Sequence, residues 1–274
     1  MDAPRLSVAL TVDHDAISDS IRLGDPPVKL SHGEFGHRVG IKRLVALLAR
    51  RAMPATFFVP GHSLTTFTDD TDVILAGGHE LACHGWMHED FAELTAGEQR
   101  DILGRSIEAI RAVAGVTPAG FRAPYWSFGE ETLGLVEAAG FVYDSSLMAD
   151  DYSLYRPRVG DRHSATDGTT WGAETSLVEA PVYWAMDDWP HFEAGDRRPR
   201  LSAPSAVLEI WIEELRYAHQ HAPGGLLTVT VHPECIGRGH RMAMLERFLD
   251  AASALDGVVF ERLDTVVDRW TAGT

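Results

Sequence analysis

"SVALTVDHDA", residues 7–16, begins as a strand and ends in a cluster of charged side chains. Val8, Leu10 and Val12 alternate with other residues, which is typical of a β-strand. Asp13 and Asp15 share one face, since strand side chains alternate with period two. The stretch predicts a buried strand that delivers two carboxylates to its C-terminal end. A strand that runs out into a polar loop is the simpler explanation for either acid alone.

The same pattern of apolar run, loop and helical stretch recurs along the whole chain. Strands are expected at 6–12, 55–59, 79–83, 119–123, 141–143, 178–183 and 225–231, with 258–260 as an eighth candidate. Amphipathic helices are expected at 40–52, 95–113, 129–139, 204–221, 240–254 and 263–270. Alternation of strands and helices predicts a parallel sheet covered by helices, and seven or eight such units favour an α/β barrel over an open sheet.

Two stretches refine this outline. The helix at 95–113 opens with Thr95 and Glu98, the residues of a capping box, and is expected to bury a face that consists of Ile102, Ser106, Ile107 and Ile110. Residues 144–176 are the least regular and are expected to form a long loop or insertion over one end. No Pro/Gly-rich linker divides the chain, so residues 1–274 are interpreted as a single domain.

Composition excludes several classes of partner. The chain has 274 residues and a formal net charge of −16, without a run of Lys and Arg, which argues against nucleic-acid or anionic-membrane binding. Its apolar runs are too short to span a membrane. The N-terminus shows no export signal. Cys83 and Cys235 lie far apart in the sequence and are expected to be reduced and buried, so we expect a cytoplasmic protein.

Side chains suited to catalysis follow five of the predicted strands, where the functional groups of a parallel barrel lie. After Asp13 and Asp15 of the first strand, the later groups are His84 and His88 in "CHGWMHED", Arg122, Tyr125 and Trp126 in "FRAPYW", Asp187, Asp188 and Trp189 in "APVYWAMDDWP", and His232 in "TVTVHPEC". A solvated barrel rim would instead carry scattered Lys, Glu and Ser.

Two histidines and one carboxylate form a three-ligand site for a divalent metal ion that leaves room for water. The spacing of His84 and His88 lets both rings face one ion if the segment forms a helix, although such a pair alone is a weak signal, and a core histidine beside a surface histidine would also explain it. A bound metal would acidify water, a second carboxylate could take the proton, and a further histidine could protonate the leaving group. This combination suits hydrolysis of an amide or ester.

The motifs "TVDHD", "HGWMH", "RAPYW", "DDW" and "VTVHP", in this order over residues 11–233, resemble those of the polysaccharide deacetylase family, also called the NodB-homology domain or carbohydrate esterase family four. The resemblance implies a distorted (β/α) barrel of NodB type and metal-dependent removal of acetyl groups from N-acetylated sugars. It also suggests a homo-oligomer, either a dimer or a tetramer.

The resemblance assigns a role to each motif residue. It implies that Asp13 is the general base, that Asp15, His84 and His88 hold the metal, usually zinc, that Arg122 orients the base, that the backbone N–H of Tyr125 binds the oxyanion, and that His232 is the general acid. An aspartate of the "DDW" segment would order the ring of His232, and Asp188 is preferred over Asp187 because it directly precedes the tryptophan. Trp189 would line the pocket. Tyr125, Trp126 and Trp189 are therefore candidate substrate contacts.

The first motif differs from that of exported family members, which read "TFDDG". Here His14 stands where the second of those aspartates would be, and the Asp-x-Asp form is similar to an intracellular branch that includes peptidoglycan-deacetylase-like enzymes, cyclic-imide hydrolases and metal-free allantoinase-like enzymes. A small amide or a soluble amino sugar is thus a candidate substrate. The alternatives are a metal-independent hydrolase of a cyclic imide or ureide, and a non-catalytic carbohydrate-binding module. His32, Glu34 and His37 are placed in a loop where this branch is expected to approach its substrate.

Overall fold

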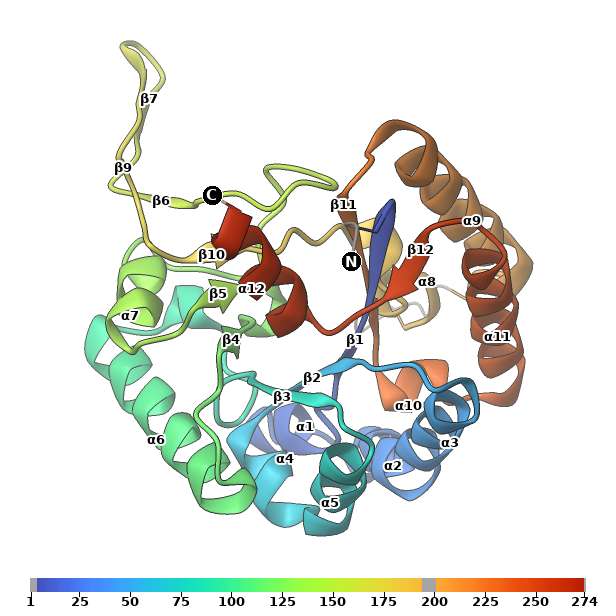
Figure 1. The fold of residues 1–274 in the computed structure, drawn as a ribbon. Helices are drawn as coiled ribbons and strands as arrows, with labels where there is room; N and C mark the ends of the chain where they lie inside the picture. Colours follow the sequence, from blue (N-terminus) through green and yellow to red (C-terminus); the bar gives the residue numbers. More distant parts are fainter. Residues whose placement is uncertain (1–3, 194–200, 274) are drawn as a thin grey trace.

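The computed structural model describes residues 4–193 and 201–273, and it is built around one sheet of eight parallel strands. The strands follow the order β10–β5–β4–β3–β2–β1–β11, and β12 pairs with β1 (Figure 1). Their bounds are β1 Leu6–Asp13, β2 Thr56–Val59, β3 Glu80–Cys83, β4 Gly120–Phe121, β5 Tyr143–Asp144, β10 Val178–Glu179, β11 Gly225–Val231 and β12 Val258–Phe260. Each lies within or beside a range predicted from the sequence, and the barrel prediction is confirmed.

The barrel is distorted because β10 and β11 form no ladder. Within the described part of the chain, a single bridge between Asp187 and Thr230 joins the two sides there. Strand β1 pairs with β11 along one edge, from Leu6 to Val12. Two strands pair with its other edge. β12 occupies the first half of that edge, from Leu6, and β2 the second half, up to Asp13. The C-terminal end of β1 is therefore flanked by β2 and β11.

Helices surround the sheet, as Figure 1 shows. Their bounds are α1 Ser18–Arg22, α2 Pro27–Phe35, α3 Ile41–Arg51, α4 Gly61–Thr66, α5 Thr68–Ala76, α6 Ala96–Ala114, α7 Thr132–Ala138, α8 Trp189–Phe192, α9 Pro204–His221, α10 Pro233–Ile236, α11 Gly239–Ser253 and α12 Leu263–Gly273. A π-helical segment, η1 (Gly36–Gly40), joins α2 to α3, and short 3₁₀ turns are η2 Phe91–Glu93, η3 Pro124–Trp126 and η4 Trp184–Met186. Among the described residues, no helix is long and apolar enough to cross a membrane.

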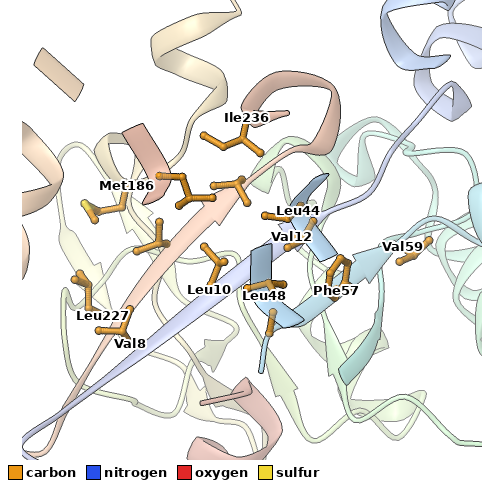
Figure 2. Close-up of a cluster of buried hydrophobic side chains, with 14 of the residues drawn as sticks. Val8, Leu10, Val12, Leu44, Leu48, Phe57, Val59, Met186, Leu227 and Ile236 are labelled. Atoms are coloured by element: carbon orange, nitrogen blue, oxygen red, sulfur yellow. The ribbon is translucent and has the colours of Figure 1, made fainter. Parts of the chain in front are cut away.

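Both faces of β1 are buried. Val8, Leu10 and Val12 belong to the outer cluster, in which Leu10 and Val12 lie near Leu44 and Leu48 of α3 and Val8 lies beside Leu227 (Figure 2). Ala9 belongs to a second cluster inside the barrel, together with Phe58, Tyr143 and the apolar residues of α12. Helix α12 thus closes the end of the barrel at which β1 begins, and the opposite end is left for the functional groups.

The capping box of α6 is confirmed. The backbone N–H of Glu98 donates to Thr95 Oγ1 (3.3 Å), and the N–H of Thr95 donates to Glu98 Oε2 (2.9 Å). The buried face of α6 includes Leu103, Ser106, Ile107 and Ile110, whereas Ile102 is only half-buried. Ser106, Ile107 and Ile110 are therefore buried as predicted, and Leu103 takes the place that was expected for Ile102.

The expectation for residues 144–176 is wrong in one respect. Four short strands, β6 (Arg158–Val159), β7 (Arg162–Ser164), β8 (Gly168–Thr170) and β9 (Ala173–Glu174), pair antiparallel into a ribbon. In Figure 1 this ribbon stands away from the barrel and covers neither end. Its outer strands β7 and β8 are fully exposed, so no apolar periodicity marked them in the sequence.

The loop expected around His32, Glu34 and His37 is also wrong, because this segment forms α2 and η1. Three glycines made the stretch resemble a loop, since glycine lowers helix propensity. They are required by close contacts: a Cβ at Gly33 would lie 2.2 Å from the carbonyl oxygen of Ala16, and one at Gly40 would lie 2.0 Å from that of Pro233. The α2–η1 segment therefore packs tightly against the loop that follows β1 and against α10, which follows β11.

Candidate active site

Strand β1 places Asp13 and Asp15 at the open end of the barrel. Both carboxylates are buried, at 3% and 6% exposure. The side chain of His14 lies between them in sequence but turns elsewhere, and its Nε2 lies 2.9 Å from Oδ2 of Asp70. Asp13 and Asp15 thus share one side of the chain, as the period of the strand predicted.

His84 and His88 follow β3 in an irregular turn and not in a helix, so the helical arrangement considered for their spacing is not the one that brings them together. Gly85 and His88 adopt positive φ angles of 71° and 58°, which bend the segment back on itself. The Nδ1 of His84 lies 2.8 Å from the carbonyl oxygen of Arg122, which leaves its Nε2 to face Asp15 Oδ1 at 3.6 Å. The Nε2 of His88 lies 3.4 Å from Asp15 Oδ2.

These three residues fit a divalent metal ion. Their ligand atoms all lie within 4.8 Å of one another, and Oδ1 of Asp15 is buried without a hydrogen-bond partner. In a tetrahedral zinc site with bonds of about 2.0–2.1 Å, neighbouring ligand atoms are roughly 3.3 Å apart, close to the distances here. The carbonyl of Arg122 fixes the ring of His84 from behind, which is the outer-shell contact that metal-binding histidines commonly make.

Arg122 is fully buried and holds Asp13. Its Nη1 donates to Asp13 Oδ1 at 2.7 Å, while its Nε and Nη2 donate to the carbonyl oxygen and hydroxyl of Ser145, each at 2.9 Å. Burial acts to raise the pKa of Asp13, but the charges of Arg122, His84 and His232 outweigh it and hold this pKa below its usual value. Asp13 is therefore an ionised carboxylate, and its Oδ2 lies 3.8 Å from the Nε2 of His84.

His232 is paired with Asp188 at the end of β11. Its Nδ1 lies 2.8 Å from Asp188 Oδ1, and its backbone N–H donates to the same carboxylate. Burial opposes protonation of the ring, but Asp187, Asp188 and Asp13 together raise the pKa of His232 well above its usual value. Asp187 lies farther from Nδ1, at 3.6 Å, and accepts the backbone N–H of Trp189. The structure therefore places Asp188, and not Asp187, in direct contact with the ring.

A cavity of about 780 Å³ opens onto these groups. Its wall includes four aromatic side chains: Tyr125, Trp126, Trp184 and Trp189. The rings of Trp126 and Trp184 lie 4.5 Å apart, and that of Trp189 lies 5.2 Å from His232. Tyr125 adopts a φ of 58°, and its hydroxyl donates to Asp19 and accepts from Arg22. The volume lies in the range of small-molecule sites.

Comparison with known proteins identifies the family. The family model for polysaccharide deacetylase matches residues 4–143. A peptidoglycan deacetylase of Helicobacter pylori is 33% identical over 282 aligned residues, which cover 97% of this chain and 96% of that protein. The chain belongs to the polysaccharide deacetylase family. Its members include enzymes that hydrolyse carbon–nitrogen bonds other than peptide bonds, and this chain is an enzyme of that class.

Solved structures agree with this assignment. A Mycobacterium smegmatis protein assigned to the polysaccharide deacetylases superposes with a TM-score of 0.84 at 34% identity, over 99% of this chain and 92% of that one. The PuuE allantoinase superposes with a TM-score of 0.82 over 98% of this chain and 91% of its own. At 21% identity, the second likeness shows a shared fold alone.

Several residues that line the pocket were not found from the sequence, and two of them, Asp19 and Glu234, have shifted pKa values. Asp19 lies 3.7 Å from Nδ1 of His88, and hydrogen bonds and charge from His88, Tyr125 and Arg22 outweigh burial and lower its pKa to about 2. Glu234 is 2% exposed, and burial together with the charge of Asp15 raises its pKa well above the usual value. Asp19 lies outside the quoted motifs, and Glu234 lies within "TVTVHPEC", two residues after His232, but was given no role there.

Of the three residues expected near the substrate, the structure places only His32 at the cavity. His32 lines the cavity, whereas Glu34 forms a surface ion pair with Arg38, and His37 contacts Asp70. Cys83 and Cys235 are free thiols in the interior, as expected.

Proposed function

We propose that this chain removes acetyl groups from N-acetylated amino sugars by metal-dependent hydrolysis. The observation that carries the proposal is the convergence of a candidate metal set, an ionised Asp13 and a protonated His232 on one cavity. The relatives named as deacetylases support the class of substrate. The aromatic wall of the cavity offers faces on which a sugar ring can stack.

Asp13 is suited to act as the general base. Arg122 occupies one of its oxygens and keeps the group ionised, so Oδ2 is the oxygen left to take a proton from the attacking water. Asp13 cannot turn away, since Arg122 is itself anchored by Ser145 and by the hydroxyl of Thr11, which accepts from Nη1 at 2.9 Å.

His232 is suited to act as the general acid. The contact with Asp188 assigns a proton to Nδ1, which leaves Nε2 to carry the proton for the leaving amine. The Nε2 of His232 lies 4.0 Å from Asp13 Oδ2, so the acid and the base stand side by side. A deacetylation needs a base that accepts a proton from water and an acid that donates a proton to the leaving nitrogen. Asp13 would be the base and His232 the acid.

Asp15, His84 and His88 would hold the metal ion, and zinc is the ion that this donor set suits best. A divalent ion bound there would lower the pKa of water and polarise the acetyl carbonyl. Tyr125, Trp126 and Trp189 are the proposed substrate contacts, and the backbone N–H of Tyr125 is proposed to donate to the oxyanion.

Metal analysis of the untagged protein tests this proposal, together with acetate release from N-acetylglucosamine oligomers. We expect about one divalent ion per chain in the native protein and its loss in Asp15→Ala and His88→Ala, because each variant removes one of three protein ligands. Glu34→Ala, which alters an exposed carboxylate, is the control and should retain both metal and activity. Native protein without metal, even after incubation with zinc, would contradict the proposal and would direct the search to cyclic imides and ureides.

A further inference from the structure

Two fully buried carboxyl groups lie behind Arg122, at the C-terminal ends of β5 and β10. They belong to Asp144 and Glu179, neither of which has any solvent exposure. The two residues are register partners in the pairing of β5 with β10, and their side chains lie within hydrogen-bond reach of each other. Among the described residues no donor reaches Oδ2 of Asp144 or Oε2 of Glu179. Two ionised carboxylates cannot form such a contact, because each would only accept.

The other oxygens of this pair hold the short turn that follows β5. Oε1 of Glu179 accepts the backbone N–H groups of Ser146 and Leu147, both at 2.9 Å. Oδ1 of Asp144 accepts the hydroxyl of Ser146 at 2.9 Å. The turn thus occupies one oxygen of each carboxyl group, and the second oxygen of each is left for the partner carboxyl.

That turn connects the pair to the site. The hydroxyl of Ser146 accepts the backbone N–H of Ala123 (2.9 Å), two residues before Tyr125. Ser145 accepts from Arg122 through both its carbonyl oxygen and its hydroxyl, and the hydroxyl in turn donates to the carbonyl oxygen of Ala180. The position of the guanidinium that holds Asp13 therefore depends on residues 145 and 146.

We infer that Asp144 and Glu179 share one proton and, as a proton-sharing pair, position Arg122 and the turn at Tyr125 for catalysis. Both are positioning residues, since neither reaches the cavity. The charged and titratable groups that face the pair are Arg122, which directly follows β4, and Tyr155 from the segment after β5. The positive charge of Arg122 favours one negative charge on the pair, and burial disfavours a second negative charge beside it. The inference rests on the proposed function for its catalytic consequence.

A double-substitution cycle tests the shared proton. In Asp144→Asn or Glu179→Gln, an amide N–H replaces the shared proton, and the oxygen that faces the turn can remain an acceptor. We expect each single variant to lower kcat by no more than about threefold. In the variant with both substitutions two N–H groups face each other and the turn is displaced, so kcat should fall about 100-fold with little change in KM. Glu174→Gln, on an exposed strand of the ribbon, is the matched control.

Thermal unfolding between pH 5 and pH 8 gives a second readout that does not need a substrate. The folded wild type must hold a proton that the unfolded chain has released, so it should lose stability relative to each single variant as the pH rises. A double variant as active and as stable as the single ones would overturn the inference. If the wild type released no acetate from any sugar, the proposed function would fail, and the unfolding cycle would still decide the pair.

Discussion

At the scale of single residues, the site is organised by buried partners that stand behind the reacting groups. Arg122 is behind Asp13, Asp188 is behind His232, and the carbonyl of Arg122 is behind His84. Each partner fixes one atom of the side chain in front of it and leaves the other atom for chemistry. The two adjacent aspartates of the "DDW" segment show how specific this arrangement is.

Asp188→Asn should lower kcat about 1,000-fold with a small change in KM, because an amide cannot stabilise the protonated ring of His232 as a carboxylate does. Asp187→Asn is the matched comparison. An amide oxygen can still accept the N–H of Trp189, so we expect a loss of less than about tenfold. Steady-state kinetics of the two variants measures the difference. Equal losses would show that the 2.8 Å contact of Asp188 has no special role.

At the scale of elements, the α2–η1 segment supports the site from outside the sheet. Its glycines contact the loop after β1 at Ala16 and the start of α10 at Pro233, so this one segment packs beside both Asp15 and His232. Its sequence gave no helical signal. Glycine content indicates flexibility when it is considered alone, and close contact with a distant backbone is not encoded in the local pattern.

Gly33→Ala should destabilise the fold and reduce activity, because its Cβ would overlap the carbonyl oxygen of Ala16, one residue from Asp15. We expect a loss of about 1–3 kcal/mol in the free energy of unfolding, as for other overpacked sites. Gly104→Ala, within α6, is the control: no atom lies within 4 Å of the added methyl group, so it should stabilise the protein by about 0.5–1 kcal/mol. Chemical denaturation of both variants measures the contrast. A harmless Gly33→Ala would show that α2 moves freely away from the loop.

At the scale of the whole molecule, the two ends of the barrel differ in what they carry. One end carries the candidate active site, and the other is closed by α12, where Glu80 is buried beneath Asp264. Burial and the charge of Asp264 raise the pKa of Glu80 to about 7, although Thr56, Tyr143 and the backbone N–H of Asp264 donate to it.

Glu80 should make the stability of the protein depend on pH. Above about pH 4.5 the unfolded chain has released this proton, while the folded chain keeps it up to about pH 7, so stability falls as the pH rises between the two values. The fall corresponds to about 3 kcal/mol. Glu80→Gln removes the titrating group and should flatten that part of the profile, which unfolding measured at pH 5 and pH 8 checks. Identical profiles for both proteins would contradict the raised pKa.

Most of the fold could be predicted from the sequence, because buried parallel strands such as 225–231 are short apolar runs and helices such as 95–113 carry their own capping signals. The candidate site could be predicted in part. Residues at strand ends were found, since parallel strands bring their C-terminal ends together. Asp19 and Glu234 were not, because they reach the cavity from two short helices, α1 and α10, whose direction only the folded backbone determines. Asp144 and Glu179 gave no signal either, since a shared proton depends on a contact between two separate strands.

The ribbon formed by β6 to β9 is a suitable place to attach a label or a tag. Its outer strands β7 and β8 project from the barrel and contribute nothing to the wall of the cavity. Exposed turn tips of this kind tolerate inserted sequence well. A fluorophore or an affinity peptide placed near Thr166 would therefore report on, or immobilise, the protein while the wall of the cavity stays unchanged.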